Sequence, residues 1–181
     1  MKILAATQEL LAELGYEQLT MEAVAARVGV SKPTLYRRWA SRAELVAAAV
    51  GDLKWSAPVP DNGSLRADLL EMAGVWFAQD PMRDAIFVRL LAALPSDEQL
   101  RELYAARVSA PRAQALAQVM GNALARGEIG DSAPVEPLRG ILPALAFHRL
   151  AVDRLPVDRT FIESVIDDVI MPLLTASGTR R

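Results

Sequence analysis

The residues with the clearest chemical potential in this chain are five cationic side chains between positions 27 and 42. They are Arg27, Lys32, Arg37, Arg38 and Arg42, and no acidic residue interrupts them. Hydroxyl and phenol groups lie among them, at Ser31, Thr34 and Tyr36. Cationic side chains bind phosphate oxygens, and hydroxyl groups can donate to phosphates or to base edges. The pattern therefore indicates a surface that binds duplex DNA.

Residues around this surface predict two short helices joined by a tight turn. Thr20 is a typical N-cap for a helix over 21–28, and Ser31 is a typical N-cap for a helix over 32–39. Gly29 supplies the backbone freedom that the turn needs. Four apolar residues should pack underneath: Ala25, Val28, Val30 and Leu35. This is the sequence pattern of a helix-turn-helix.

In such a motif, the N-terminal part of the second helix reaches the base edges of the major groove. Lys32 can donate to guanine, and Thr34 can offer a hydroxyl or contact a thymine methyl group. Tyr36, Arg37 and Arg38 are long enough to reach the flanking phosphates.

Two helix N-termini should add phosphate contacts, through Thr20 and through Arg42 with the free N–H groups beside it. Ser31 and Pro33, which lies in the first turn of its helix, complete the expected DNA-facing set. The alternative is a solvated basic helix with a half-buried Tyr36. The agreement of turn, caps and spacing favours DNA binding.

Apolar periodicity predicts seven further helices, and no segment alternates as a strand does, so we expect an all-α fold of about nine helices. The seven are expected over 1–14, 42–54, 64–79, 82–93, 97–126, 135–152 and 158–175. Ser41 and Glu44 have capping-box spacing at the start of one of them. Pro111 should kink or split another, because it removes a hydrogen bond inside the helix.

Composition restricts the classes of protein that this chain can represent. The net charge is −2, but residues 1–50 carry six basic and five acidic groups, against 14 and 17 in the remainder. With no cysteine and one histidine, we expect no disulfide and no metal site, and we predict no cofactor and no catalytic residues. Gln8 and Glu9 interrupt any leader-like apolar run, and no segment suits a membrane span, so a cytoplasmic protein is expected.

Residues 3–50 resemble the DNA-binding domain of TetR-type transcriptional regulators. The resemblance is carried by Ala5-Ala6, Gly15-Tyr16, Thr20, the Val-Gly-Val-Ser turn at 28–31, and Leu35-Tyr36 followed by basic and aromatic residues. It implies that Tyr36 and Lys32 carry phosphate and base contacts. Trp39 stands where phenylalanine is more usual. Family members often have a basic arm before the first helix, and any contact from it is expected to be either missing or trimmed here.

The Pro/Gly/Ser-rich stretch at 56–64 predicts a boundary between a DNA-binding domain, 1–54, and an effector-binding and dimerisation domain, 55–181. Candidate pocket residues are Met72, Trp76, Phe77, Phe87, Arg89, Leu90, Tyr104, Arg107, Val108 and Met120. Core packing is the alternative role of the apolar ones. Arg89 lies among apolar neighbours, as either a residue at the pocket rim or an anchor for a carboxylate.

The last two helices carry more apolar residues than one buried face needs. In TetR-type proteins these helices pair with their counterparts in a dimer; the alternative is complete burial within one chain. The candidate interface residues are Leu138, Ile141, Leu142, Leu145, His148, Phe161, Ile162, Val165, Ile166 and Val169.

Together these features predict a dimeric repressor that binds a palindromic operator in double-stranded DNA and is released by a small hydrophobic or amphipathic effector. The alternative is a small-molecule carrier or interaction module that docks on DNA without sequence preference. An enzyme is the least favoured class.

Overall fold

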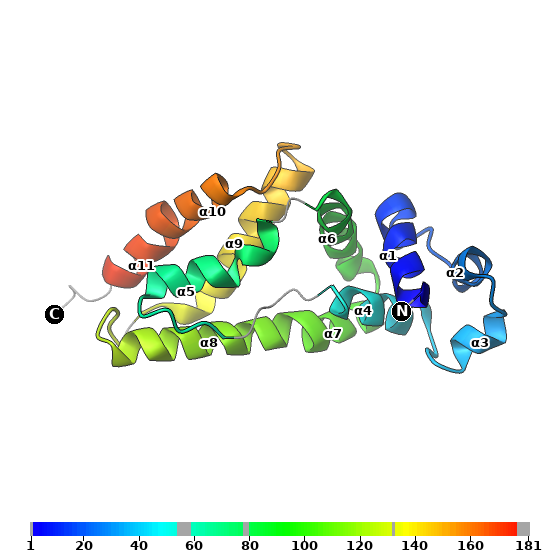
Figure 1. Cartoon of the computed structure of the whole chain (residues 1–181), viewed down its shortest axis with the longest axis horizontal. Coiled ribbons are helices and arrows are strands. Elements are labelled where there is room, and N and C mark those ends of the chain that lie inside the picture. Colours follow the sequence, from blue (N-terminus) through cyan, green and yellow to red (C-terminus); the bar gives the residue numbers. More distant parts are fainter. Residues whose placement is uncertain (1, 54–58, 78–79, 132, 177–181) are drawn as a thin grey trace. The chain divides into compact units, whose positions relative to one another are not determined.

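The computed structural model describes residues 2–53, 59–77, 80–131 and 133–176, and within them every regular element is helical (Figure 1). The first seven elements are α1 (Lys2–Leu14), α2 (Met21–Val28), α3 (Lys32–Tyr36), α4 (Arg42–Gly51), α5 (Leu65–Met72), the 3-10 turn η1 (Gly74–Trp76) and α6 (Pro81–Ala93). The others are the 3-10 turn η2 (Leu94–Ser96), α7 (Glu98–Tyr104), the π turn η3 (Ala105–Ser109), α8 (Ala110–Ala125), α9 (Val135–Ala151), α10 (Arg159–Val165), the π turn η4 (Ile166–Ile170) and α11 (Met171–Ala176). The all-α expectation is confirmed.

The chain packs as two compact units. The first, unit 1, comprises residues 1–54 and 80–110, and unit 2 comprises 55–79 and 111–181. Packing therefore joins α6 and α7 to the N-terminal helices, which a single boundary after residue 54 did not anticipate. The functional division at that boundary stays a prediction.

In unit 1, α1 packs against α2, α4 and α6, and α4 also packs against α7. Leu11, Leu19, Leu35 and Leu45 are completely buried in this core. Ala25 is buried as well, whereas Val28 and Val30 are half-buried. These apolar side chains pack α2 and α3 against the core of unit 1, as the sequence predicted.

Gly29 ends α2 in the left-handed conformation, at φ 72°. Its conformation lets the N–H of Val30 donate to the carbonyl of Ala25 at 3.0 Å, which closes the turn before α3. The second helix is shorter than the predicted 32–39. It ends at Tyr36, and the N–H of Trp39 still donates to the carbonyl of Leu35 at 2.9 Å.

Two prolines inside the later helices are each preceded by a π turn. The N–H of Ala110 donates to the carbonyl of Ala105, five residues back, immediately before Pro111. The N–H of Met171 likewise donates to the carbonyl of Ile166 before Pro172. A wider turn makes room for a ring that would collide with the carbonyl four residues earlier. The distortion expected at Pro111 is therefore a π turn, and helix continues on both sides of it.

Unit 2 contains a buried carboxylate, Asp68 of α5, with no exposed surface. Its Oδ2 accepts from Arg126 Nη2 at 3.0 Å, and its Oδ1 accepts from the N–H of Asn62 at 2.6 Å. The same guanidinium also binds Asp61 at 2.8 Å and Glu128 at 2.6 Å. This cluster joins the start of α5 to the end of α8.

Candidate nucleic-acid interface

Capping interactions define where the helices of the predicted DNA-binding surface begin. The hydroxyl of Thr20 accepts from the N–H of Ala23 at 3.1 Å, so the predicted cap of α2 is present. The hydroxyl of Ser41 accepts from the N–H of Glu44 at 3.1 Å. The carboxylate of Glu44 accepts in return from the N–H of Ala40 at 2.8 Å, one residue before its expected partner. These bonds satisfy backbone donors that a helix N-terminus would otherwise leave open.

Ser31 occupies the N-cap position of α3, but its side chain makes no capping bond there. Its Oγ lies instead 2.9 Å from Oγ1 of Thr34. The expectation that its hydroxyl caps α3 is corrected in this respect. The paired hydroxyls fix the rotamer of Thr34 and leave one proton for an outside acceptor.

Lys32, the first residue of α3, forms an ion pair with Glu22 in the first turn of α2. The hydrogen bond from Lys32 lowers the pKa of Glu22, and the same bond raises the pKa of Lys32. Its Nζ also lies 5.7 Å from the ring centroid of Tyr36. Lys32 is therefore oriented across α3 by an acid and an aromatic ring.

Acidic residues of neighbouring helices neutralise part of the cationic stretch. Arg27 binds Glu13 at 2.8 Å and Glu9 at 3.3 Å, both on α1. The separation of charges along the sequence, with the acids outside residues 27–42, therefore does not hold in space. Sequence reasoning missed these pairs, because Glu9 and Glu13 reach Arg27 only through the packing of α1 against α2, which no local pattern reveals.

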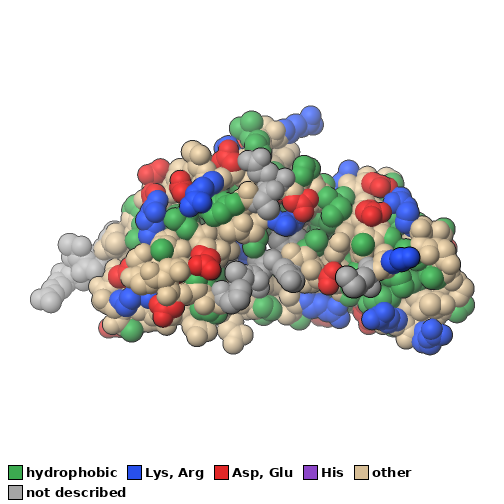
Figure 2. Space-filling view, in the orientation of Figure 1, with side chains coloured by type: hydrophobic (Ala, Val, Ile, Leu, Met, Phe, Trp, Pro, Cys, Tyr) green, Lys and Arg blue, Asp and Glu red, His purple; other side chains and the backbone are tan. Residues whose placement is uncertain are grey.

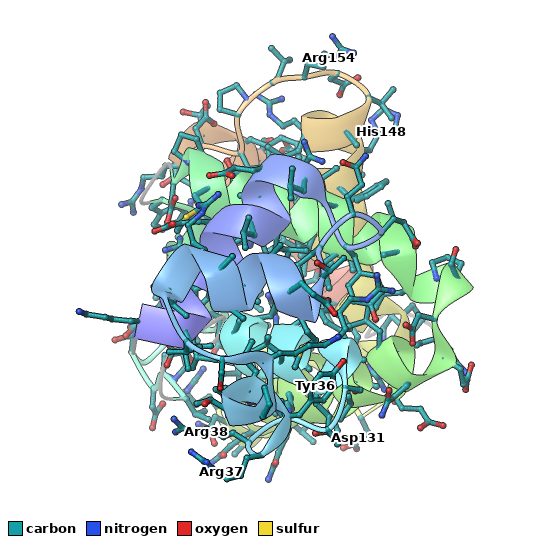
Figure 3. All side chains as sticks on the ribbon, turned by 90° about the vertical axis from the view of Figure 1, so that its right-hand side faces the viewer. Tyr36, Arg37, Arg38, Asp131, His148 and Arg154 are labelled. Carbon is teal, nitrogen blue, oxygen red and sulfur yellow. The ribbon has the colours of Figure 1, made fainter. Side chains whose placement is uncertain are left out.

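Arg37 and Arg38 remain the open cations of this surface. Both are exposed, and within the described residues neither has an acidic partner. The guanidinium of Arg38 stacks 5.1 Å from the ring centroid of Trp39, and Tyr36 beside them is 44% exposed. Figure 3 shows Arg37 and Arg38 pointing away from the ribbon. In Figure 2, blue side chains are prominent along the lower right edge, where Figure 1 places α3.

Arg42 makes contacts that differ from the predicted phosphate clamp. Its Nη1 donates to the carbonyls of Tyr16, Glu17 and Leu19 at 3.2–3.4 Å. Its guanidinium also stacks 4.0 Å from the ring centroid of Tyr16. The N–H of Glu44 in the same turn is already bound by Ser41. The Nη1 group of Arg42 and the N–H of Glu44 are therefore already bonded within unit 1.

The candidate pocket residues are divided between the two units. Met72, Trp76, Phe77 and Met120 lie in unit 2, and Phe87, Arg89, Leu90, Tyr104, Arg107 and Val108 lie in unit 1. Trp76, Phe87, Leu90, Val108 and Met120 are buried, whereas Arg89 and Arg107 are exposed. Arg89 lies against Gly15 at the end of α1. Their role as a pocket stays a prediction.

The candidate interface residues differ in burial within unit 2. Leu138, Ile162, Val165 and Ile166 are buried in a single chain, and Ile141, Leu142 and Phe161 are half-buried. Leu145 is 37% exposed and Val169 is 36% exposed. His148 is exposed and its Nδ1 lies 3.3 Å from Asp153. The exposed side chains and the half-buried ones keep surface that a partner could cover.

The described residues offer neither a membrane-spanning helix nor a cluster of metal ligands. Across residues 2–53, 59–77, 80–131 and 133–176, no helix is long and apolar enough to cross a membrane. Within the same ranges, no group of three acidic, histidine or cysteine side chains could hold a metal ion.

Comparison with known proteins agrees with this arrangement of helices. The family model for bacterial regulatory proteins of the tetR family matches residues 3–49. The model for the C-terminal domain of tetracyclin repressor-like proteins matches residues 59–169. Both halves of the chain therefore match the same family.

Individual relatives extend over nearly the whole chain. An uncharacterized HTH-type transcriptional regulator of Mycobacterium tuberculosis is 34% identical, over 97% of this chain and 88% of that protein. A DNA-binding transcriptional repressor TetR of Mycobacteroides abscessus is 30% identical, over 95% and 92%. The crystal structure of a TetR family transcription regulator aligns with a TM-score of 0.67 at 32% identity, over 93% and 94%. The chain belongs to the TetR family of helix-turn-helix transcriptional regulators, as the resemblance of residues 3–50 predicted.

Proposed function

We propose that this regulator is a ligand-responsive repressor that binds a near-palindromic operator as a dimer. The open cationic end of α3, formed by Tyr36, Arg37 and Arg38, is the observation that supports the proposal most. These groups can reach phosphates on either side of a groove that α3 enters. The relative from Mycobacteroides abscessus is a DNA-binding transcriptional repressor, which favours repression, and a DNA-bound regulator works in the cytoplasm.

The proposed contacts divide into those that recognise base edges and those that bind phosphates. Lys32, Ser31 and Thr34 lie at the start of α3 and face the base edges, with Pro33 fixing the backbone between them. Thr20 adds a phosphate contact at α2, because a hydroxyl that accepts from Ala23 can still donate its own proton. Arg42 is left out of this set, because its Nη1 already donates to backbone carbonyls and its guanidinium stacks on the ring of Tyr16.

The proposed dimer uses α9 together with the helix that runs from α10 to α11. Ile141, Leu145 and His148 follow one another at spacings of four and three, so they share one face of α9. Val169 supplies an exposed apolar side chain from the π turn of the other helix. A second copy would cover these side chains, and a two-fold dimer is the commonest oligomer of soluble proteins.

The proposed effector is a small hydrophobic or amphipathic molecule, because apolar side chains dominate the candidate pocket residues of both units. Its binding would weaken the operator complex by a coupling free energy of about 1–3 kcal/mol, which is roughly a 5- to 150-fold change in affinity. Response to small molecules is typical of the family, and it supports this part of the proposal.

Selection from a pool of random duplexes at about 150 mM salt tests the reading of DNA. We expect enrichment of a near-palindromic sequence. Arg37→Gln and Arg38→Gln should each weaken binding to all duplexes and reduce the salt slope by about 1, whereas Thr34→Ala should change the preferred sequence. Arg66→Gln, an exposed arginine of unit 2, is the matched control and should leave binding unchanged. Failure to enrich any sequence would favour the carrier or interaction module with non-specific docking.

Light scattering of two interface variants tests the dimer. Leu145→Glu and Val169→Glu place charge on side chains that are partly exposed in one chain, so they should give folded monomers. Leu124→Glu, at a position 41% exposed on α8, is the control and should remain a dimer. Dimers in all three variants would place the interface elsewhere.

A further inference from the structure

The turn between α1 and α2, residues 15–19, is held by side chains from other helices of unit 1. We call this segment the α1–α2 corner. It leads directly into Thr20, the cap of α2, so its position determines where the helix-turn-helix begins. Arg42 from α4, Arg89 from α6 and Asp97 at the start of α7 all contact the corner.

Tyr16 carries the contact with α7. Its ring is 2% exposed, and its hydroxyl donates to Oδ2 of Asp97 at 2.5 Å, across 81 residues of sequence. The other carboxylate oxygen of Asp97 accepts from the N–H of Leu100 at 2.9 Å and so caps α7. One carboxylate therefore fixes the start of α7 and the corner at the same time.

Arg42, the first residue of α4, is the third member of this cluster. Its Nη1 reaches the carbonyls of Tyr16, Glu17 and Leu19, and its Nη2 lies 4.0 Å from Oδ2 of Asp97. The guanidinium also covers the ring of Tyr16, so the phenol contacts both a cation and an anion. The corner consequently has partners on both α4 and α7.

Arg89 restrains the other end of the corner. A Cβ added to Gly15 would lie 3.2 Å from Nη1 of Arg89, and Gly15 has a φ of +79°, so this position suits glycine on both counts. The cationic side chain from α6 lies at the C-terminal end of α1, where it complements the helix dipole.

We propose that Asp97 is a positioning residue for DNA binding: through Tyr16 it holds the α1–α2 corner, and with it the first turn of α2, on the start of α7. The inference rests on the proposed function, in which α2 and α3 contact DNA. It gives residues 80–110 a direct connection to the DNA-binding helices that does not pass through α4.

The protonation states of Tyr16 and Asp97 favour the hydrogen bond between them at neutral pH. Burial, reinforced by the hydrogen bond to Asp97, raises the pKa of Tyr16 to about 12. The bond from Tyr16 and the N–H of Leu100 lower the pKa of Asp97. At neutral pH the phenol is therefore a donor and the carboxylate an acceptor.

Three variants of the full chain test the inference. Tyr16→Phe removes the hydroxyl and keeps the buried ring beneath Arg42. Asp97→Asn keeps an acceptor for the N–H of Leu100, and the third variant combines both changes. Asp158→Asn is the matched control, because Asp158 caps α10 in unit 2 through the N–H of Phe161 at 2.8 Å and has no part in the corner.

Affinity is measured for the duplex that the wild-type chain selects and for a random-sequence duplex. Each single variant should bind the selected duplex about five- to tenfold more weakly, with less than about a twofold change on the random duplex. The double variant should match the singles, because both changes remove the same bond, the one that the phenol donates to a charged carboxylate. Unchanged affinity, additive losses or equal losses on both duplexes would overturn the positioning role.

Amide hydrogen exchange supplies a second readout that needs no DNA. The variants should exchange faster at residues 15–24, with protection of α8 and of α10 unchanged. Unaltered exchange at the corner would overturn the inference even if affinity fell. Failure of the wild-type chain to select any duplex would contradict the proposed function alone, since exchange would still report whether Asp97 holds the corner.

Discussion

Each unit of this chain contains a cluster in which an arginine and carboxylates join segments far apart in the sequence. The clusters differ in their exposure to water. In unit 2, Asp68 is fully buried against Arg126, whose side chain is 24% exposed. In unit 1, the side chains of Arg42 and Asp97 are 31% and 27% exposed. The unit 2 cluster compensates a buried charge, whereas the role proposed for the unit 1 cluster is to position the α1–α2 corner.

Burial changes what each ion pair contributes. A carboxylate without water depends on its partners for solvation, so removing one partner of such a pair costs a large part of the stability of the fold. A carboxylate that keeps some water loses less, because the solvent replaces part of each broken bond. We therefore expect the unit 2 cluster to affect unfolding strongly, and the unit 1 cluster to affect geometry more than stability.

Replacing the two central carboxylates tests this difference most directly. Asp68→Ala should lower the free energy of unfolding by about 3 kcal/mol, because Arg126 and the N–H of Asn62 both lose an acceptor. Asp97→Ala should lower it by about 1–2 kcal/mol, because the N–H of Leu100 loses its cap and the hydroxyl of Tyr16 loses its acceptor, and both bonds are only partly buried.

Urea unfolding of the full chain gives both values under the same conditions. Asp158→Ala serves as a control for simple cap loss, at about 1 kcal/mol. Equal losses of unfolding free energy in Asp68→Ala and Asp97→Ala would mean that burial does not determine how much each cluster contributes to stability.

The sequence predicted α2, its cap and the glycine turn because these features depend on neighbours within a few residues. Thr20 bonds to Ala23, three residues away, and Gly29 sets the turn by its own backbone conformation. The proline at 111 likewise predicted a local distortion, although it could not specify a π turn. Pro172 carried the same signal and was not used.

Contacts between distant segments could not be predicted in this way. Tyr16 meets Asp97 across 81 residues, and Asp68 meets Arg126 across 58. Arg42 looked like a phosphate ligand because nothing in its local sequence reveals the three carbonyls that it binds. The number of open cations at α3 also depends on Glu22, whose approach to Lys32 follows from the packing of α2 on α3.

Alkaline titration sharpens the description of the unit 1 cluster. Tyr16 should ionise near pH 12, and Tyr16→Phe should remove this step from the phenolate absorbance. The raised pKa contributes stability below about pH 10 that is lost as the pH rises through 12, because only the unfolded chain ionises readily in this window.

The wild-type chain should therefore lose roughly 1–3 kcal/mol relative to Tyr16→Phe between pH 10 and pH 12. Parallel loss in both proteins would show that Tyr16 is not held in its protonated form.

The smallest effect should come from the ion pair between Arg66 and Asp167, which joins α5 to the π turn η4. The bond is bidentate, at 2.7 and 2.8 Å, but the side chains are 48% and 39% exposed. Because water and salt screen such a pair, Arg66→Ala should lower the melting temperature by less than about 3 °C, and the difference should shrink further in about 1 M salt. A loss as large as that of Asp68→Ala would show that geometry outweighs burial, and the distinction between the two clusters would then fail.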